Sequence, residues 1–224
     1  MEIPNVARIA ILGTGKIARG LGRAWARKGH PVTFGSRSHA RGRAFADEIG
    51  FGTLGADAAS AVDGAQVVLL AVPWADAAMV VRSINFDAKV VIDPTNPMDE
   101  RFVPLTDAET SLAEMIAGAA PSARVVKAFN TTFAQIYDLE ETLLREAETN
   151  TYLASDDEEA KTLVGSLAAE IGFSPIDAGP LAVSRLLEAA AAFIATLAYK
   201  RDFGQFISLN VHEFAAVGVP ERAA

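Results

Sequence analysis

The chain has 224 residues, of which 50% are hydrophobic and 21% are charged, and this balance excludes an intrinsically disordered protein. Its net charge of −8 argues against a partner that is nucleic acid or an anionic membrane surface. The sequence contains no cysteine, which excludes disulfides, zinc ribbons and iron–sulfur clusters. No other pattern indicates a metal site, and we expect none.

The cellular location is predicted from two segments. The first five residues lack the basic region and apolar core of a signal peptide. The longest nearly apolar run covers residues 189–199, which is too short to cross a bilayer. We therefore expect a cytoplasmic protein with no membrane partner.

Short β-branched runs alternate with alanine-rich stretches along the chain. This alternation predicts an α/β fold, a doubly wound (Rossmann), mostly parallel sheet with helices on both faces and a short C-terminal helical extension. The expected strands are residues 7–12, 32–34, 67–72, 90–92, 124–128, 151–154 and, more weakly, 174–176.

Helices are expected between these strands. Residues 17–28 and 41–49 have helical patterns that end at a glycine, a common left-handed C-cap. The patterns Ser111-Leu112-Ala113-Glu114 and Ser155-Asp156-Asp157-Glu158 predict two further helix starts, each with a capping box. The last clear helix is expected over residues 183–199.

A glycine-rich segment follows the first expected strand and opens the first helix. Its sequence, Gly13-Thr14-Gly15-Lys16-Ile17-Ala18, matches the Gly-x-Gly-x-x-Ala pattern of dinucleotide sites. Gly13 would permit the tight turn, Gly15 would let the backbone approach a pyrophosphate, and Ala18 would keep the helix close to the sheet. The unpaired amides of the helix start would then face an anion. The alternative is a glycine-rich turn without a ligand, but the strand–turn–helix context favours a dinucleotide.

The end of the second strand indicates which dinucleotide is bound. An NAD site commonly places an acid about 20 residues after the glycine motif, whereas this chain has none here before Asp47. Ser36, Arg37 and Arg41 instead offer hydrogen-bond donors and fixed positive charge to a 2′-phosphate. These residues predict NADP as the cofactor. Arg43 is expected on an exposed helix face.

The ends of later strands should face the same ligand. Val72 ends the third expected strand and Pro73 and Trp74 follow it, and doubly wound sheets bind ligands at the carboxyl ends of their strands. Trp74 would flank the ribose or the nicotinamide, or else cap the core.

We expect no catalytic acid or base. None of the three histidines, His30, His39 and His212, has a convincing carboxylate partner for proton transfer. This favours an enzyme that transfers a hydride between two planar rings, where alignment does most of the work.

The whole arrangement resembles the NADPH-dependent reductases of coenzyme F420, the 8-hydroxy-5-deazaflavin. It is also similar to the N-terminal oxidoreductase domain of the six-transmembrane metalloreductases. The resemblance extends to about Gly204 and rests on Gly13-Thr14-Gly15, Gly35-Ser36-Arg37, Val72-Pro73-Trp74, Asp177-Ala178-Gly179-Pro180-Leu181 and Ser184-Arg185-Leu186.

The resemblance implies a role for each matching position. The pyrophosphate would be held by Thr14, Gly15, Lys16 and Ile17, the 2′-phosphate by Ser36, Arg37 and Arg41, and the nicotinamide half by Val72, Trp74 and Ala134. The deazaflavin would stack on the nicotinamide near Asn130 and Thr132. Members of the family are typically homodimers built through the C-terminal helix. Residues 1–180 would then be the NADP-binding Rossmann domain, and residues 181–224 a helix and tail for dimerisation and pocket closure.

The chain departs from the deazaflavin reductases beside the second substrate. Where these would have His-Thr-Ile-Pro, it reads Asn130-Thr131-Thr132-Phe133. Asn130 can hydrogen-bond a carbonyl edge but cannot donate a proton as an imidazolium can, and Phe133 would crowd or cover the pocket. Because these positions face the second substrate, the resemblance implies either coenzyme F420 or a flavin-like ring as the acceptor. The alternatives are an NADP(H)-binding redox sensor without turnover and a reductase of a small imine or ketone.

Overall fold

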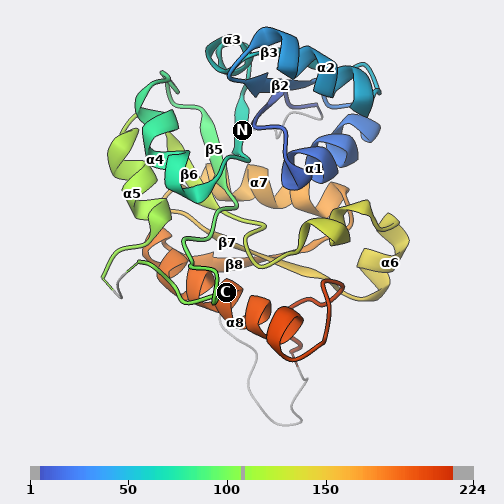
Figure 1. Ribbon diagram of the computed structural model, residues 1–224, viewed down its shortest axis with the longest axis vertical. Helices are drawn as coiled ribbons and strands as arrows, with labels where there is room; N and C mark the ends of the chain where they lie inside the picture. The colour runs from blue at the N-terminus through green and yellow to red at the C-terminus, as the bar shows by residue number, and fades with distance from the viewer. Residues whose placement is uncertain (1–5, 107–108, 214–224) are drawn as a thin grey trace.

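The computed structural model describes residues 6–106 and 109–213, and within them one sheet has the strand order β3-β2-β1-β4-β5-β6-β7-β8 (Figure 1). Neighbouring strands are parallel except for β6 and β7, which pair antiparallel. This confirms the doubly wound, mostly parallel α/β fold. The strands are β1 (Ile9–Leu12), β2 (Val32–Ser36), β3 (Leu54–Asp57), β4 (Val67–Leu70), β5 (Val90–Asp93), β6 (Arg124–Lys127), β7 (Asn150–Ala154) and β8 (Ser174–Gly179).

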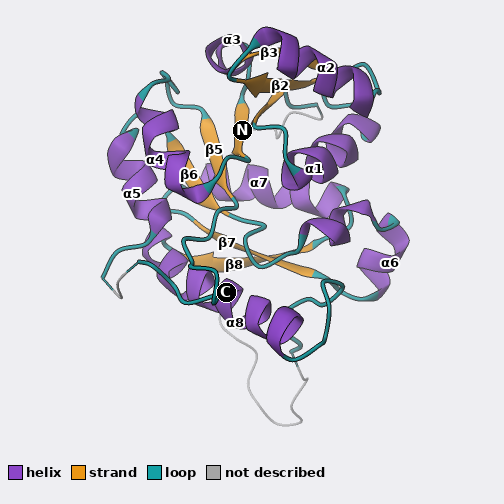
Figure 2. Cartoon of the chain, viewed as in Figure 1, coloured by secondary structure: helices purple, strands orange, loops and turns teal. Residues whose placement is uncertain are grey.

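Helices cover both faces of the sheet (Figures 1 and 2). Successive residues of a strand point to opposite faces, so Ile9 and Ile11 of β1 belong to the core cluster that includes residues of α1 and α7, while Ala10 and Leu12 belong to the cluster that includes residues of α3, α4 and α5. The helices are α1 (Lys16–Arg27), α2 (His39–Ile49), α3 (Ala58–Asp63), α4 (Trp74–Arg82), α5 (Leu112–Ala119), α6 (Glu141–Glu146), α7 (Glu158–Glu170) and α8 (Ser184–Lys200), with short 3₁₀ segments η1 (Ala134–Asp138) and η2 (Leu181–Val183).

The two predicted capping boxes have different outcomes. The Ser111 side chain accepts a hydrogen bond from the Glu114 amide, and the Glu114 carboxylate accepts one from the Ser111 amide, so this box is confirmed. The box at Ser155 is wrong. Asp157 caps α7 instead, accepting from the Ala160 amide, because the Ser155 hydroxyl donates to the Val125 carbonyl and holds the chain against β6.

Part of helix α8 is buried in the core, and part of it carries exposed apolar side chains. The segment Leu181–Lys200 is 20 residues long with a mean hydropathy of 1.7, so by length and composition alone it could cross a membrane, although its nearly apolar run covers only residues 189–199. Half of this segment is buried within the fold, where Leu187 packs against Tyr152 and Ala154 of β7. Leu186 and Phe193 are 70% and 55% exposed. Residues 214–224 of the expected C-terminal extension lie outside the described residues.

Candidate functional site: a dinucleotide cleft

The turn between β1 and α1 is shaped by two glycines with different constraints. Gly13 has a φ of +124°, and a Cβ placed there would lie 2.1 Å from the Ala71 carbonyl oxygen, so only glycine fits. Gly15 precedes α1, and no atom lies within 4 Å of the position its Cβ would take. No side chain caps α1. The open space and uncapped amides are what an incoming pyrophosphate requires.

One cavity of about 640 Å³ joins the glycine turn to the end of β2. Its lining includes the predicted residues Gly13, Thr14, Gly15, Ser36, Arg37 and Arg41. The Arg41 Nε atom donates to Thr14 Oγ1 over 3.2 Å, which ties the start of α2 to the glycine turn. The structure thus brings the predicted pyrophosphate and 2′-phosphate residues together.

The predicted 2′-phosphate pocket differs from expectation at two residues, Ser36 and Asp57. The Ser36 hydroxyl donates to the Ser38 carbonyl over 2.6 Å, so its hydrogen serves the turn before α2 and is not directed to a ligand. Asp57, at the end of β3, lines the cavity and caps α3 through the Ser60 amide. This hydrogen bond lowers the pKa of the Asp57 carboxyl, so a carboxylate lines the same cavity as Arg37 and Arg41.

A second cavity of about 480 Å³ adjoins the first. Gly15, Ala71, Val72 and Pro73 line both cavities, so one elongated ligand can occupy the two. The remaining predicted residues that line the second cavity are Lys16, Ile17, Trp74, Asn130 and Thr132. Ala134 is not brought to this cavity, because it opens η1 and packs against the core around β1 and α1.

Three aromatic rings from distant segments meet at the second cavity. Phe102 and Tyr199 stack with their centroids 5.1 Å apart, and Phe133 meets Tyr199 edge-on at 5.8 Å. Phe102 has a φ of +68°, an unfavourable backbone conformation for a bulky residue. The predicted proximity of Phe133 to the pocket agrees with this placement, whereas Phe102 and Tyr199 could not be foreseen because their contact joins the loop after β5 to the end of α8.

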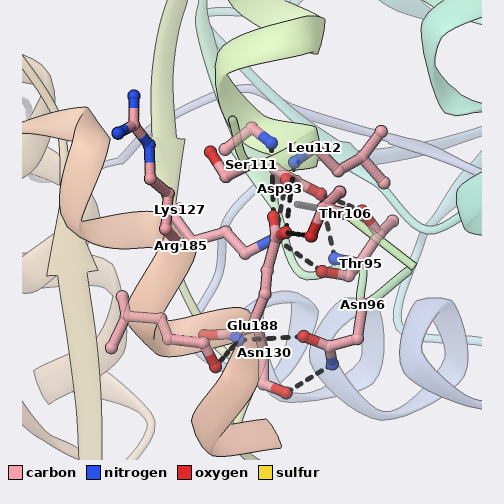
Figure 3. Close-up of polar contacts among 12 residues, drawn as sticks. Asp93, Thr95, Asn96, Thr106, Ser111, Leu112, Lys127, Asn130, Arg185 and Glu188 are labelled. Atoms are coloured by element: carbon pink, nitrogen blue, oxygen red, sulfur yellow. Dashed lines mark hydrogen bonds and ion pairs between the residues drawn. The ribbon is translucent and has the colours of Figure 1, made fainter. Parts of the chain in front are cut away.

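Asn130 is a buried residue that lines the same cavity as the aromatic rings. Its Nδ2 atom donates to Asn96 Oδ1 over 2.9 Å and to the Leu187 carbonyl over 2.8 Å (Figure 3). Both amide hydrogens are therefore used inside the protein, and Asn130 has none left for the carbonyl edge of a substrate. Its Oδ1 atom is buried without a hydrogen-bond partner in the described part of the chain.

Beside this amide pair lies a fully buried ionic cluster (Figure 3). The Lys127 ammonium donates to Asp93 Oδ2 over 3.0 Å, to the Thr95 carbonyl over 2.5 Å and to Glu188 Oε1 over 2.8 Å. The Glu188 carboxylate also accepts from the Leu112 amide at the start of α5. The cluster thereby fastens the loop after β5, which lines the second cavity, to α8, which forms another of its walls.

The titratable groups around the second cavity are few. Lys16 is the charged residue among those that line it, and the described lining residues include no carboxylate or imidazole. His30 is buried, accepting from the Ala7 amide and hydrogen-bonded to Glu170, and His212 lies 3.2 Å from Glu148. Neither residue reaches either cavity.

Comparison with known proteins finds matches in both sequence and structure. Residues 8–97 match the family described as NADP oxidoreductase, coenzyme F420-dependent. The metalloreductase STEAP3 of Rattus norvegicus is 28% identical over 189 residues, which is 84% of this chain and 37% of that protein. The chain thus spans little more than a third of the length of this relative.

Two solved structures share most of this fold. A candidate F420-dependent NADP reductase from Arthrobacter sp. FB24 superposes with a TM-score of 0.80 at 25% identity, over 92% of this chain and 100% of that one. The hypothetical protein SMa0349 from Sinorhizobium meliloti superposes with a TM-score of 0.70 at 28% identity, over 80% of this chain and 87% of that one.

Proposed function

Residues 8–97 match the family described as NADP oxidoreductase, coenzyme F420-dependent, and from this match we propose that the chain transfers a hydride between NADP(H) and a deazaflavin or flavin-like ring. The observation that carries this proposal is the pair of adjoining cavities. One contains Arg37 and Arg41 and the other the aromatic rings, and they share Gly15 and Val72. A dinucleotide with its 2′-phosphate at the arginines would reach the aromatic end with its nicotinamide.

The lining of the second cavity supports transfer between rings. In the forward direction NADPH gives up a hydride from its nicotinamide ring and becomes NADP⁺, while the acceptor ring gains that hydride and takes one proton from water. Alignment of the two rings supplies most of the catalysis in such a step. The described lining offers apolar and aromatic surface and no carboxylate or imidazole, which suits ring alignment better than acid–base chemistry.

We also propose that the protein is a cytoplasmic homodimer. The exposed Leu186 and Phe193 on α8 support association through this helix, since exposed apolar side chains gain stability when a partner covers them. Light scattering of the purified protein tests this: a dimer that Phe193→Glu converts to a monomer supports the proposal, and a monomeric wild type contradicts it.

The acceptor is tested by NADPH oxidation with coenzyme F420, FMN, FAD and a ferric chelate in separate assays. Turnover with F420 would show that Asn130 and Phe133 are tolerated variations of the deazaflavin pocket. Turnover with FMN or FAD alone would show that these residues favour a flavin. Tight NADPH binding without turnover with either ring type would contradict the proposal and favour a redox sensor.

A further inference from the structure

The orientation of the Asn96 side chain is determined by a chain of hydrogen bonds that begins on α8. The Leu187 carbonyl can only accept, so the amide group of Asn130 that faces it must be Nδ2. The other hydrogen of Asn130 Nδ2 points to Asn96, which must therefore present its oxygen. Asn96 Nδ2 is then left to donate to the Asn130 backbone carbonyl over 2.7 Å.

This arrangement leaves Asn96 with one unused hydrogen. An amide nitrogen carries two hydrogens, and among the described residues only the Asn130 carbonyl accepts from Asn96 Nδ2. Asn96 is half-buried and lines the second cavity. A donor in such a place normally has a partner, and a ligand in the cavity can provide it.

The position of Asn96 is fixed on both sides. The carbonyl of the preceding residue, Thr95, accepts from the buried Lys127 ammonium, and Lys127 is itself held by Glu188. Leu187 and Glu188 of α8 thus hold the loop after β5 indirectly, since Leu187 accepts from Asn130 and Glu188 from Lys127. Such rigidity preserves a donor's alignment between the free and the bound state.

We propose that Asn96 Nδ2 donates its free hydrogen to a carbonyl oxygen on a ring bound in the second cavity, and that Asn130 is the positioning residue that orients it. The inference rests on the proposed function, because it assumes that rings bind there. Two carbonyl groups could accept this hydrogen bond: that of the nicotinamide carboxamide and that of the acceptor ring. In either case Asn96 makes the direct contact with the ligand that the sequence assigned to Asn130, and Asn130 orients Asn96.

The test uses ligand affinities, which do not depend on turnover. We would measure the dissociation constants of NADPH and of adenosine 2′,5′-bisphosphate, which lacks the nicotinamide, for the wild type, Asn96→Ala and Asn130→Ala. For the same proteins, the KM of any active acceptor is measured at saturating NADPH. Asn85→Ala is the control, because Asn85 is an exposed asparagine outside both cavities. Loss of one neutral hydrogen bond should weaken the affected ligand by roughly three- to tenfold.

Two results support the inference and distinguish the carbonyls. A weaker affinity for NADPH with unchanged binding of the bisphosphate identifies the nicotinamide carboxamide. An unchanged NADPH affinity with a raised acceptor KM identifies the acceptor ring. In both cases Asn130→Ala should have the same effect, and the double variant should be no worse than either single one.

Two results would overturn it: unchanged constants for every ligand, or an equal loss for NADPH and the bisphosphate. If Asn96→Ala does not fold, Asn96→Ser replaces it, since a hydroxyl has a single hydrogen and cannot serve both Asn130 and a ligand. Absence of turnover with every acceptor would contradict the proposed function. The affinities for NADPH and the bisphosphate would still show whether Asn96 donates to the nicotinamide carboxamide.

Discussion

The ammonium of Lys127 lies 2.8 Å from Glu188 Oε1 and 3.0 Å from Asp93 Oδ2, and none of these three side chains is more than 2% exposed. The contact links β6 to α8 and to the end of β5. Removing one partner from a buried ionic cluster leaves a charge without compensation, which costs far more than the loss of a surface pair. The walls of the second cavity therefore depend on Lys127.

We expect Lys127→Met to lower the free energy of unfolding by about 3–5 kcal/mol, because two buried carboxylates then face each other without a cation. Urea denaturation at pH 7 measures this change. The matched control is Glu48→Gln, which removes a charge from the exposed pair between Arg19 and Glu48 and should leave stability unchanged within error. A Lys127→Met protein as stable as the wild type would contradict the structural role of the cluster.

Substitutions of the two glycines of the turn should have different effects, one on stability and the other on NADPH binding. Gly13→Ala should destabilise the protein, because its Cβ would collide with the Ala71 carbonyl. Gly15→Ala should fold with unchanged stability, since its Cβ enters open space, but should bind NADPH at least tenfold more weakly because a methyl group then occupies the path of the pyrophosphate. Thermal melting and NADPH titration measure the two effects. Tight NADPH binding by Gly15→Ala would place the pyrophosphate elsewhere.

Arg37 should discriminate between the two nicotinamide cofactors. Loss of a charge-assisted contact to the 2′-phosphate costs on the order of 2 kcal/mol, or about thirtyfold in affinity. Arg37→Ala should weaken NADPH binding by this factor and leave NADH binding nearly unchanged. Arg43→Ala is the control, because Arg43 is exposed and does not line the cavity. Equal losses for NADPH and NADH in Arg37→Ala would refute the assignment of the 2′-phosphate site.

The pH dependence of stability should include a contribution from Glu114. Hydrogen bonds from Arg185 lower the pKa of the Glu114 carboxyl from 4.5 to about 2. A carboxyl whose pKa is lowered by folding stabilises the protein fully above pH 4.5, and this contribution is lost as the pH falls toward 2. Glu114→Gln should therefore be less stable than the wild type at pH 7, and the difference should shrink between pH 4.5 and 2. Urea denaturation at several pH values measures it, and a constant difference would exclude this linkage.

The strands that were predicted well are those buried on both faces. The strands β1 and β4 are continuous apolar runs, and β5 is apolar up to its last residue, Asp93; such runs are typical of the centre of a parallel sheet. The edge strand β3, Leu54–Asp57, was not predicted because its residues are at least partly exposed and two of them are small. Asp57, which β3 brings to the first cavity, was missed for the same reason.

The site was predictable where its residues are close in the sequence. The glycine turn and the arginines after β2 form local motifs, and the structure brings both to one cavity. Lys127 and Glu188 lie 61 residues apart, and no local pattern indicates that they meet. The sequence assigns the contact with the substrate to Asn130 and not to Asn96. Only the structure shows that the Asn130 amide already donates to the carbonyl of Leu187 on α8.

Direct transfer of the hydride between two rings is the central claim, and isotopic labelling tests it most directly. NADPH carrying deuterium at both C4 positions is incubated with the protein and coenzyme F420, and the reduced product is analysed by mass spectrometry. We expect one deuterium per molecule of reduced F420, at C5, with none released to water. Release of the label to solvent, or no reduction of F420 by a protein that binds NADPH tightly, would contradict direct transfer to a deazaflavin.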